Sequence, residues 1–495
     1  MRKRIISGIM AAIALACLVA GAGAAGRVPL TVMMFGDNTP SATNSVKRAL
    51  EEKLGVDLTF VYVPEKDYTA KLNTLIAART LPDIFWVDGN VVDTVEFRDQ
   101  GMLLKMDKLL KSDGQNIMAE VGGLLKNSPV NQGDGIYGIF PASLDYTSNL
   151  SVRADWLARL KLKMPTNLDE LYKVLHAFTF DDPDGNGKKD TIGYVGTMAN
   201  LRTFEHIFGA YGIAVNQNYL LKNGTVTTYM KAPQYLDAIK YLRKLYQDGI
   251  LDPDFVTLPL MSAFEKLWTG RTGIFDFQDV GTTNNWMPGR YVEKNPSPAF
   301  GFAIIAGPGG KGGAIKQYPR YNYLNCIAST SKHPEKAMEY LNYLYGREGD
   351  ELTYLGVEGL HYEWVDKENG KYKLLGKFTD QATYRGDGAF IYNKMYPLLN
   401  TEVRTLNKQT RDGQALAREN AIEYPKILKN LKTTGDFGPQ LANITKEAFA
   451  QLIVTKGNVD AEYQAFVKRW NEEGGLEFEK EATAAYAAQL KAASK

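Results

Sequence analysis

Hydrophobic and polar positions near the start of the chain switch repeatedly between the period of a strand and the period of a helix. The pattern predicts, in order, a strand at 30–35, a helix at 45–54, a strand at 56–63, a helix at 67–79 and a strand at 83–87. Gly55 is expected to end the first helix, and Asp67 is a candidate N-cap of the second. A β-α-β-α-β order predicts an α/β fold with a mainly parallel, right-handed, doubly wound sheet.

The same reading continues through the rest of the chain. It predicts strands at 137–141, 150–153 and 320–328, and helices from residue 166 and at 234–247, 262–269 and 334–345. The C-terminal hundred residues are expected to be mostly helical. The run GPGGKGG at 307–313 lacks the Lys-Ser/Thr of a phosphate loop, so it is interpreted as a surface turn.

The first 25 residues have the pattern of a secretion signal. Arg2, Lys3 and Arg4 precede an apolar run at 5–20, and small residues follow. Cleavage is expected near Ala24 or Ala25. A competing interpretation is a lipoprotein whose lipid is attached at Cys17. Either pathway would export the protein to the periplasm or the cell surface.

Charge and cysteine content limit the partners of the exported chain. The sequence holds 58 basic and 56 acidic residues, and three of the basic ones lie in the signal, so the remainder carries a formal net charge of −1. Such a balance does not favour binding to nucleic acid or to an anionic membrane. Only Cys326 remains beyond Cys17, so no internal disulfide can form. The remaining length suggests two or three lobes.

An acidic loop at residues 182–193 has the spacing of a calcium-binding loop. Side-chain oxygens of Asp182, Asp184, Asn186 and Asp190 and the carbonyl of Lys188 are the candidate ligands, with Gly187 at the sharp turn. Position 12 of the loop is Gly193 instead of the usual Glu, so further ligands would have to be water or other residues. The alternative is an unloaded Asx/Gly turn.

Candidate substrate-binding residues lie near the carboxyl ends of the predicted strands, where open α/β sheets bind ligands. Sugar rings pack on aromatic faces, and their hydroxyls bond to carboxylates and amides. Asp37 and Asn38 follow the first strand, and Trp86 and Asp88 lie at the end of the third. Further candidates, from loops and other strand ends, are the aromatic residues Trp286, Tyr321, Tyr323, Tyr362 and Trp364 and the acid Glu358.

With these residues in place, the chain resembles the extracellular solute-binding proteins of ABC importers. It is most similar to the oligosaccharide-binding subgroup that includes the alginate-binding proteins. The resemblance is carried by LPDIFWVDG (81–89), YGIFPASLDY (137–146), the run 151–193, SKHPEKAMEYLNYLY (331–345), YLGVEGLHYEWVDKENGKY (354–372) and the tail 435–475.

The resemblance implies a two-lobe periplasmic-binding-protein clamshell, type II-like, with hinge crossings. Family pattern assigns 27–145 and 320–400 to the N-terminal lobe, and 150–315 and 405–495 to the C-terminal lobe. An oligosaccharide would bind in the interlobe cleft, close the lobes, and be delivered to the transmembrane permease subunits by a monomeric protein. Asp145 and Tyr146 would contact it at the first crossing, and Trp86 and Asp88 match an aromatic–acid pair of a related sugar-binding protein. In the alginate-binding relatives the acidic loop holds a structural calcium ion.

Two other functional classes remain open. A polysaccharide hydrolase or lyase is disfavoured because no H-E-x-x-H, C-x-x-C, G-x-S-x-G or nucleotide-phosphate motif occurs and the four histidines are scattered. A ligand-loaded sensor on the same fold would be distinguished by its receptor partner. Arg153, Asp155 and Trp156 are interpreted as a structural pair with packing.

Overall fold

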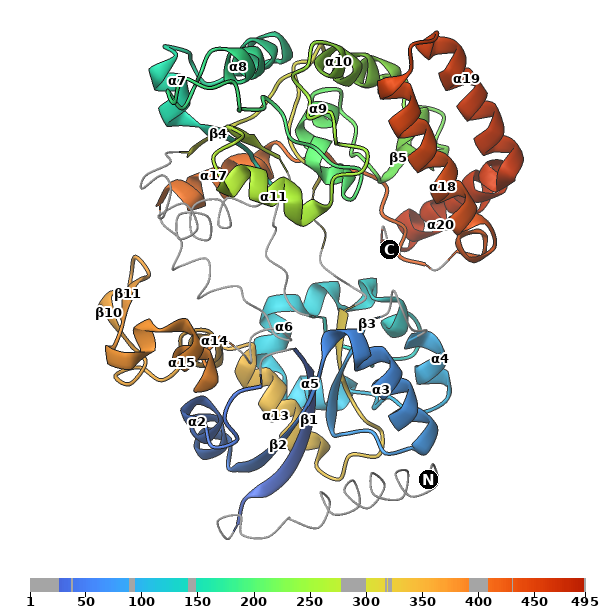
Figure 1. The fold of residues 1–495 in the computed structure, drawn as a ribbon. Coiled ribbons are helices and arrows are strands. Elements are labelled where there is room, and N and C mark those ends of the chain that lie inside the picture. The colour runs from blue at the N-terminus through green and yellow to red at the C-terminus, as the bar shows by residue number, and fades with distance from the viewer. Residues whose placement is uncertain are drawn as a thin grey trace, which may run out of the picture. The chain divides into compact units, whose positions relative to one another are not determined.

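The chain folds into two compact units, each built from two separate segments. The computed structural model describes residues 26–36, 39–88, 94–140, 148–276, 300–316, 318, 323–390, 408–429 and 431–493. Unit 1 comprises Met1–Leu144 and Pro319–Thr405, and unit 2 comprises Asp145–Tyr318 and Leu406–Lys495 (Figure 1). The chain therefore passes from one unit to the other three times.

Unit 1 contains a sheet with helices around it and a small hairpin. Its strands and helices are β1 (Val28–Phe35), α2 (Ser45–Leu54), β2 (Val56–Val63), α3 (Glu65–Ala78), β3 (Ile84–Asp88), α4 (Thr94–Asp99), α5 (Asp107–Asp113), α6 (Gln115–Val121), β9 (Tyr323–Ile327), α13 (Pro334–Leu344), α14 (Arg347–Leu355), β10 (Tyr362–Asp366), β11 (Lys371–Leu374) and α15 (Gln381–Gly386).

The sheet of unit 1 has the strand order β2-β1-β3-β9. Strand β1 pairs in parallel with β2 and β3, as the β-α-β-α-β pattern predicts, and β9 pairs antiparallel to β3. The chain re-enters unit 1 beside the carboxyl end of β3, where Tyr323 pairs with Asp88, so β9 has to run in the opposite direction. The carboxyl ends of β1, β2 and β3 and the start of β9 consequently lie along one edge of the sheet.

Unit 2 is mostly helical around a short sheet. Its elements are β4 (Leu150–Arg153), α7 (Ala154–Arg159), α8 (Leu168–Phe180), α9 (Glu205–Ala210), β5 (Asn218–Leu220), β6 (Val226–Thr228), α10 (Tyr235–Gln247), α11 (Leu260–Trp268), β7 (Ile274–Phe275), β8 (Phe300–Ala303), α17 (Lys408–Glu419), α18 (Lys432–Val454), α19 (Val459–Trp470) and α20 (Leu476–Ala493). The sheet β7-β4-β8 is antiparallel, and β5 and β6 form a separate hairpin.

One hydrophobic core joins the early and late parts of unit 2. Leu171 and Phe178 of α8, Tyr235 of α10, and Phe449 and Trp470 of the C-terminal helices all belong to it. The α18–α20 helices, red in Figure 1, confirm the predicted helical C-terminal region. Because α10 packs on α18, the second segment of unit 2 completes a core that the first segment leaves open.

Three local expectations differ from the structure. Helix α3 begins at Glu65 after Pro64, so Asp67 lies in its first turn and is not the N-cap. Within 137–140, the described part of a predicted strand, only Ile139 forms a bridge, with Asn325. In the glycine-rich run, residues 308–311 are exposed, but Gly313 is buried. A Cβ added there would lie 1.8 Å from the Asn420 carbonyl oxygen, so close backbone packing explains this glycine.

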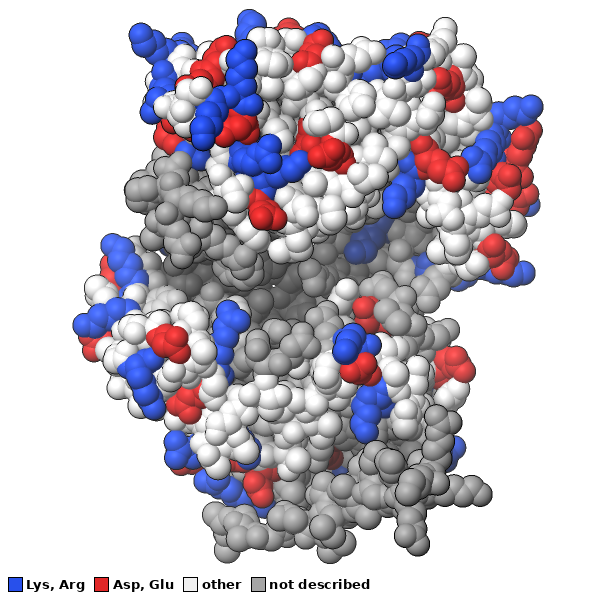
Figure 2. All heavy atoms as spheres, in the orientation of Figure 1, with Lys and Arg blue, Asp and Glu red and all other residues white. Residues whose placement is uncertain are grey.

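The surface of each unit carries both signs of charge. Figure 2 shows basic and acidic side chains interspersed on the face in view, without a large area of one sign on the described surface. This agrees with the near-zero net charge of the sequence. No helix among the described residues is long and apolar enough to cross a membrane.

Candidate functional site

Four aromatic rings gather at the carboxyl edge of the unit 1 sheet. Phe35 is the last residue of β1, Trp86 lies in β3, Tyr323 begins β9 and Tyr68 lies in α3. The Trp86 ring centroid lies 4.6 Å from that of Phe35, 5.4 Å from that of Tyr323 and 5.7 Å from that of Tyr68. We refer to Phe35, Trp86 and Tyr323 as the strand-end platform.

Tyr68 supports the platform by hydrogen bonding to the backbone of Trp86. Its side chain is buried, and its hydroxyl donates to the Trp86 carbonyl and accepts from the Trp86 N–H, both at 3.1 Å. Burial raises the pKa of Tyr68, so the phenol remains protonated and able to donate. These two hydrogen bonds fix the backbone of β3 at the point where the Trp86 ring projects.

The platform offers the groups that a sugar-binding surface needs. Phe35, Trp86 and Tyr323 are each partly exposed, as is Asp88. Trp86 and Asp88 are two residues apart on β3 and therefore point to the same side of the sheet, and Asp88 pairs directly with Tyr323. The structure thus brings Trp86, Asp88 and Tyr323 together, and it adds Phe35 and Tyr68, which sequence reasoning did not select. The position of Phe35 at the end of β1 was the available signal.

Six other candidates cannot be placed. The residues that lie outside the described part of the chain are Asp37, Asn38, Asp145, Tyr146, Trp286 and Tyr321. Their role in binding stays a prediction.

The remaining candidates lie in or beside the β10–β11 hairpin of unit 1. The Tyr362 side chain is 2% exposed, packed edge-on against Trp364 at 5.4 Å. Trp364 is partly exposed and also meets Tyr372 edge-on at 6.2 Å. Glu358 is exposed and lies 3.7 Å from the Lys367 ammonium. Burial of Tyr362 favours a role in holding the hairpin together over direct stacking on a ligand.

The acidic loop of unit 2 folds around the side chain of Asn186. Its amide Nδ2 donates to Asp184 Oδ2 at 2.8 Å and to Asp190 Oδ1 at 3.3 Å. Backbone N–H groups of Asn186 and Gly187 donate to the two carboxylate oxygens of Asp182, each at 3.0 Å. Gly187 has φ of +75°, the left-handed conformation that the turn needs. The N–H of Lys188 donates to Asn186 Oδ1 at 2.7 Å.

The charges of this loop are crowded. Partial burial raises the pKa of Asp184, and the nearby negative charges of Asp190 and Asp182 raise it further. Three carboxylates and one amide are oxygen donors of the kind that calcium prefers, and a cation among them would relieve this repulsion. The donor set therefore fits a calcium ion.

A buried ionisable cluster, which sequence reasoning missed, lies elsewhere in unit 2. Among the described residues, Glu205, His206 and Asp276 are the one group of three acids or histidines whose ligand atoms lie within 4.8 Å of one another. His206 Nδ1 lies 2.5 Å from Asp276 Oδ1, and Arg202 pairs with Glu205 at 3.0 Å. The arginine supplies the positive charge that a metal would otherwise provide, so the cluster is a structural ion network.

Arg153 and Asp155 form the predicted structural pair, and Trp156 packs against it. The Arg153 side chain is fully buried and donates through Nε to Asp155 Oδ1 at 2.7 Å. Its guanidinium carbon lies 4.8 Å from the Trp156 ring centroid. These contacts join the end of β4 to the start of α7 and confirm the structural interpretation.

Comparison with known proteins finds relatives along nearly the whole chain. The chain is 26% identical over 489 residues to lipoprotein LipO of Bacillus subtilis strain 168, covering 94% of this chain and 93% of that protein. It is 24% identical over 474 residues to the polygalacturonan/rhamnogalacturonan-binding protein YtcQ of the same strain, covering 92% of this chain and 90% of that protein.

Solved structures share the fold at low sequence identity. An extracellular solute-binding protein from Bifidobacterium longum subsp. infantis aligns with a TM-score of 0.74 at 19% identity, over 94% of this chain and 99% of that one. An EF-hand mutant of FusA from S. pneumoniae, in complex with fructo-nystose, aligns with 0.69 at 20% identity, over 94% and 100%. The alginate-binding protein AlgQ2 without calcium ion aligns with 0.66 at 17% identity, over 94% and 98%. The fold is the two-lobe clamshell of these proteins.

The family model for bacterial extracellular solute-binding proteins matches residues 36–351. This match covers more than half of the chain and includes Trp86 and Tyr323 of the strand-end platform. The chain therefore belongs to the bacterial extracellular solute-binding protein family.

Proposed function

We propose that this protein is the substrate-binding component of an ABC importer and that its substrate is an oligosaccharide. The observation that carries the proposal is the strand-end platform with Asp88 beside it. Partly exposed aromatic faces bind the C–H side of a sugar ring, and a neighbouring carboxylate accepts hydrogen bonds from its hydroxyls. The names of two relatives support the proposal, the polygalacturonan/rhamnogalacturonan-binding protein YtcQ and the fructooligosaccharide ABC transporter substrate-binding protein FusA.

The mechanism we propose is ligand-driven closure of two lobes. The lobes are taken as residues 27–145 with 320–400 and 150–315 with 405–495. The platform binds one side of the sugar, and Asp145, Tyr146 and Trp286 contact it from the crossing and from unit 2. Because the ligand contacts both lobes only when they are closed, it shifts the population toward the closed form, which docks on the permease. The protein acts as a monomer and catalyses no reaction on the sugar.

The acidic loop is assigned to a structural calcium ion in this proposal. Asp182, Asp184, Asn186 and Asp190 would hold it, with the Lys188 carbonyl. Asn186 would present its oxygen to the ion in place of the NH2 group that now contacts Asp184. The EF-hand mutant of FusA among the similar structures supports a calcium loop in this fold. The ion stabilises the loop and takes no part in sugar binding.

Export follows the signal pattern of the first 25 residues. We propose a protein that acts outside the cytoplasmic membrane, in agreement with its extracellular family. The name of LipO supports an anchored form, for which Cys17 is the residue to test. Mass spectrometry of the exported protein distinguishes a lipid on Cys17 from cleavage near Ala24 or Ala25.

The test of the function is a thermal-shift screen against oligosaccharides, followed by calorimetry and analysis of the sugar afterwards. A ligand that binds only the folded state raises its stability by about 2.7 kcal/mol at a hundredfold excess over Kd. We expect one oligosaccharide class to give such a shift and to be recovered intact. A consumed sugar would show an enzyme, and a sugar bound without compaction in small-angle scattering would contradict closure.

A further inference from the structure

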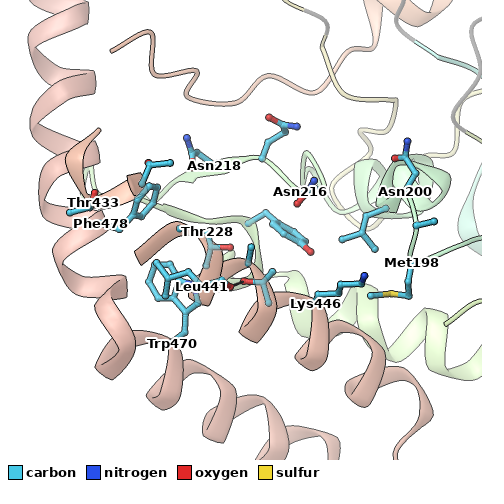
Figure 3. Close-up of a pocket in the computed structure, with 18 residues that line it drawn as sticks. Met198, Asn200, Asn216, Asn218, Thr228, Thr433, Leu441, Lys446, Trp470 and Phe478 are labelled. Atoms are coloured by element: carbon cyan, nitrogen blue, oxygen red, sulfur yellow. Dashed lines mark hydrogen bonds between the residues drawn. The ribbon is translucent and has the colours of Figure 1, made fainter. Parts of the chain in front are cut away.

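Unit 2 contains a pocket of about 510 Å³ that is separate from the strand-end platform. It lies between residues 198–201, the β5–β6 hairpin and the C-terminal helices α18–α20 (Figure 3). Its volume falls within the range of about 300–1,000 Å³ that small-molecule sites occupy. Every lining residue belongs to unit 2, and none is among the residues proposed to bind the transported sugar.

The apolar part of the pocket is preformed because it belongs to the core. Met198, Leu441 and Trp470 line the pocket, and all three are buried members of the unit 2 core. The Lys231 ammonium lies 5.1 Å from the Trp470 ring centroid and 2.5 Å from a Glu479 carboxylate oxygen, which holds it over the ring. Phe478 meets Trp470 edge-on at 6.3 Å. Such a wall needs little rearrangement to receive a ligand.

Side-chain amides form the polar part of the pocket. Four of them line it, those of Asn200, Asn216, Gln217 and Asn218, and the Asn218 NH2 group donates to the Pro425 carbonyl at 3.4 Å. The Asn200 oxygen accepts from the Arg202 N–H at 3.1 Å, which leaves its NH2 group available to donate. Asn216 and Gln217 make no side-chain hydrogen bond to any described residue. Amides arranged in this way can both donate to and accept from hydroxyl groups.

The residues that line the pocket carry charge of one sign only, which is positive. Lys446 of α18 is the single charged residue among the lining side chains, and no carboxylate accompanies it. Lys446 is exposed and forms no ion pair within the described chain. Figure 3 shows its ammonium beside Met198, at the end of the pocket that Asn200 also borders. A negatively charged group would find a partner here, and no carboxylate of the lining would repel it.

We propose that this pocket is a second ligand site and that it binds a sugar ring carrying one carboxylate, a uronic acid. The amides would bond its hydroxyls, the partly exposed Phe478, which packs edge-on against the buried Trp470, would supply the apolar wall, and Lys446 would pair with its carboxylate. The site does not depend on the proposed transport function, because the two sites share no residue.

The experiment is 19F NMR of the full exported chain labelled with 5-fluorotryptophan. The sequence contains six tryptophans, so Trp470 and Trp86 can be assigned by the variants Trp470→Phe and Trp86→Phe. The probes are D-galacturonic, D-glucuronic and D-mannuronic acid, with D-galactose as the neutral counterpart of the first. We expect at least one uronic acid to shift the Trp470 resonance with saturation, and galactose to do so much more weakly.

Substitutions then locate the site. Lys446→Met should weaken this response about tenfold or more, since a hydrogen bond to a charged group is lost. Lys446→Arg should retain most of it, and Lys468→Met, which removes an exposed charge from the neighbouring α19, should have no effect. Saturation of the Trp470 signal that persists in Trp86→Ala would separate this pocket from the platform.

Two results would overturn the proposal. One is the absence of any saturable Trp470 shift with all three uronic acids. The other is an equal affinity in Lys446→Met and the unsubstituted protein, because the response would then come from binding elsewhere.

Discussion

Trp86 of unit 1 lies in strand β3 and Trp156 of unit 2 lies in helix α7, and each has an aspartate within two residues along the chain, yet their surroundings differ. Trp156 is 2% exposed, packed between the Arg153 guanidinium and the Phe178 ring. Trp86 is partly exposed among other rings that are themselves partly exposed. A buried ring stabilises the fold, whereas a partly exposed ring keeps a face available to a ligand. Substitutions can therefore separate stability from binding.

Trp156→Ala should test how much the buried ring contributes to stability. Removing a fully packed tryptophan is expected to lower the free energy of unfolding by about 3–5 kcal/mol, because the lost contacts leave a cavity beside Arg153. Urea denaturation measures this change in the free energy of unfolding. The folded fraction should bind oligosaccharide with unchanged affinity. A loss below about 1 kcal/mol would mean that the site collapses easily around the smaller side chain.

Calcium should also change the stability of unit 2 and leave sugar affinity unchanged. At a hundredfold excess over its Kd, the ion is expected to raise the free energy of unfolding by about 2.7 kcal/mol without changing sugar affinity. Asp184→Asn should remove most of this gain. Asp181→Asn, an exposed neighbour outside the ligand set, is the control and should keep it. Equal unfolding curves in calcium and in chelator would exclude the assigned ion.

Trp86→Ala should affect sugar affinity more than stability, in contrast to Trp156→Ala. We expect oligosaccharide affinity to fall by roughly 1–3 kcal/mol, on the scale of one aromatic contact, with a smaller change in stability because the ring is partly exposed. Calorimetry measures the affinity. Trp268→Ala is the control, since Trp268 is also partly buried but stacks on Phe264 in α11, far along the chain from the platform. Unchanged affinity in Trp86→Ala would remove Trp86 from the site.

The buried cluster of unit 2 predicts a pH dependence of stability. Burial raises the pKa of Glu205. Burial alone would lower that of His206, but the Asp276 charge and hydrogen bond outweigh it and raise it. Both groups hold protons more tightly in the folded state, so this stability is present at mildly acid pH and is lost as pH rises through the raised pKa values.

The slope of this loss is limited to about 1.4 kcal/mol per pH unit for each proton. Melting temperatures measured from pH 5 to pH 9 should fall across neutral pH, and Glu205→Gln should flatten the curve. A melting temperature that rises over this interval would contradict the assignment.

Tyr68→Phe should give a small effect on the platform. The change removes the hydroxyl that bonds the Trp86 backbone but keeps the ring. Because a neutral hydrogen bond contributes about 0.5–1.5 kcal/mol, we expect a modest loss of stability and a similarly modest loss of sugar affinity. Calorimetry and urea denaturation on the same samples measure both. A large loss of affinity with no loss of stability would place Tyr68 in direct contact with the sugar.

Local patterns predicted the elements of unit 1 well because short-range chemistry decides them. Helix α2 runs over Ser45–Leu54 as the apolar period indicates, and Gly55 ends it with φ of 65°. Helix α8 begins after Asn167, whose side chain accepts from the Glu170 N–H. The helix expected to be capped by Asp67 begins earlier, at Glu65, and no side chain caps its start.

Sequence order could indicate that Trp86 and Asp88 share one strand face, since alternation along a strand is local. It could not show that Tyr323, more than two hundred residues later, begins an antiparallel strand against Asp88. Nor could it show that Tyr68 supports Trp86, that Tyr362 is buried, or that Glu205 and His206 meet Asp276. The pocket beside Lys446 has walls from three distant segments. Periodicity and caps act within a few residues, so the sequence determines single helices and strands. Which distant side chains meet is decided only when the separate segments of the chain pack together in the tertiary structure.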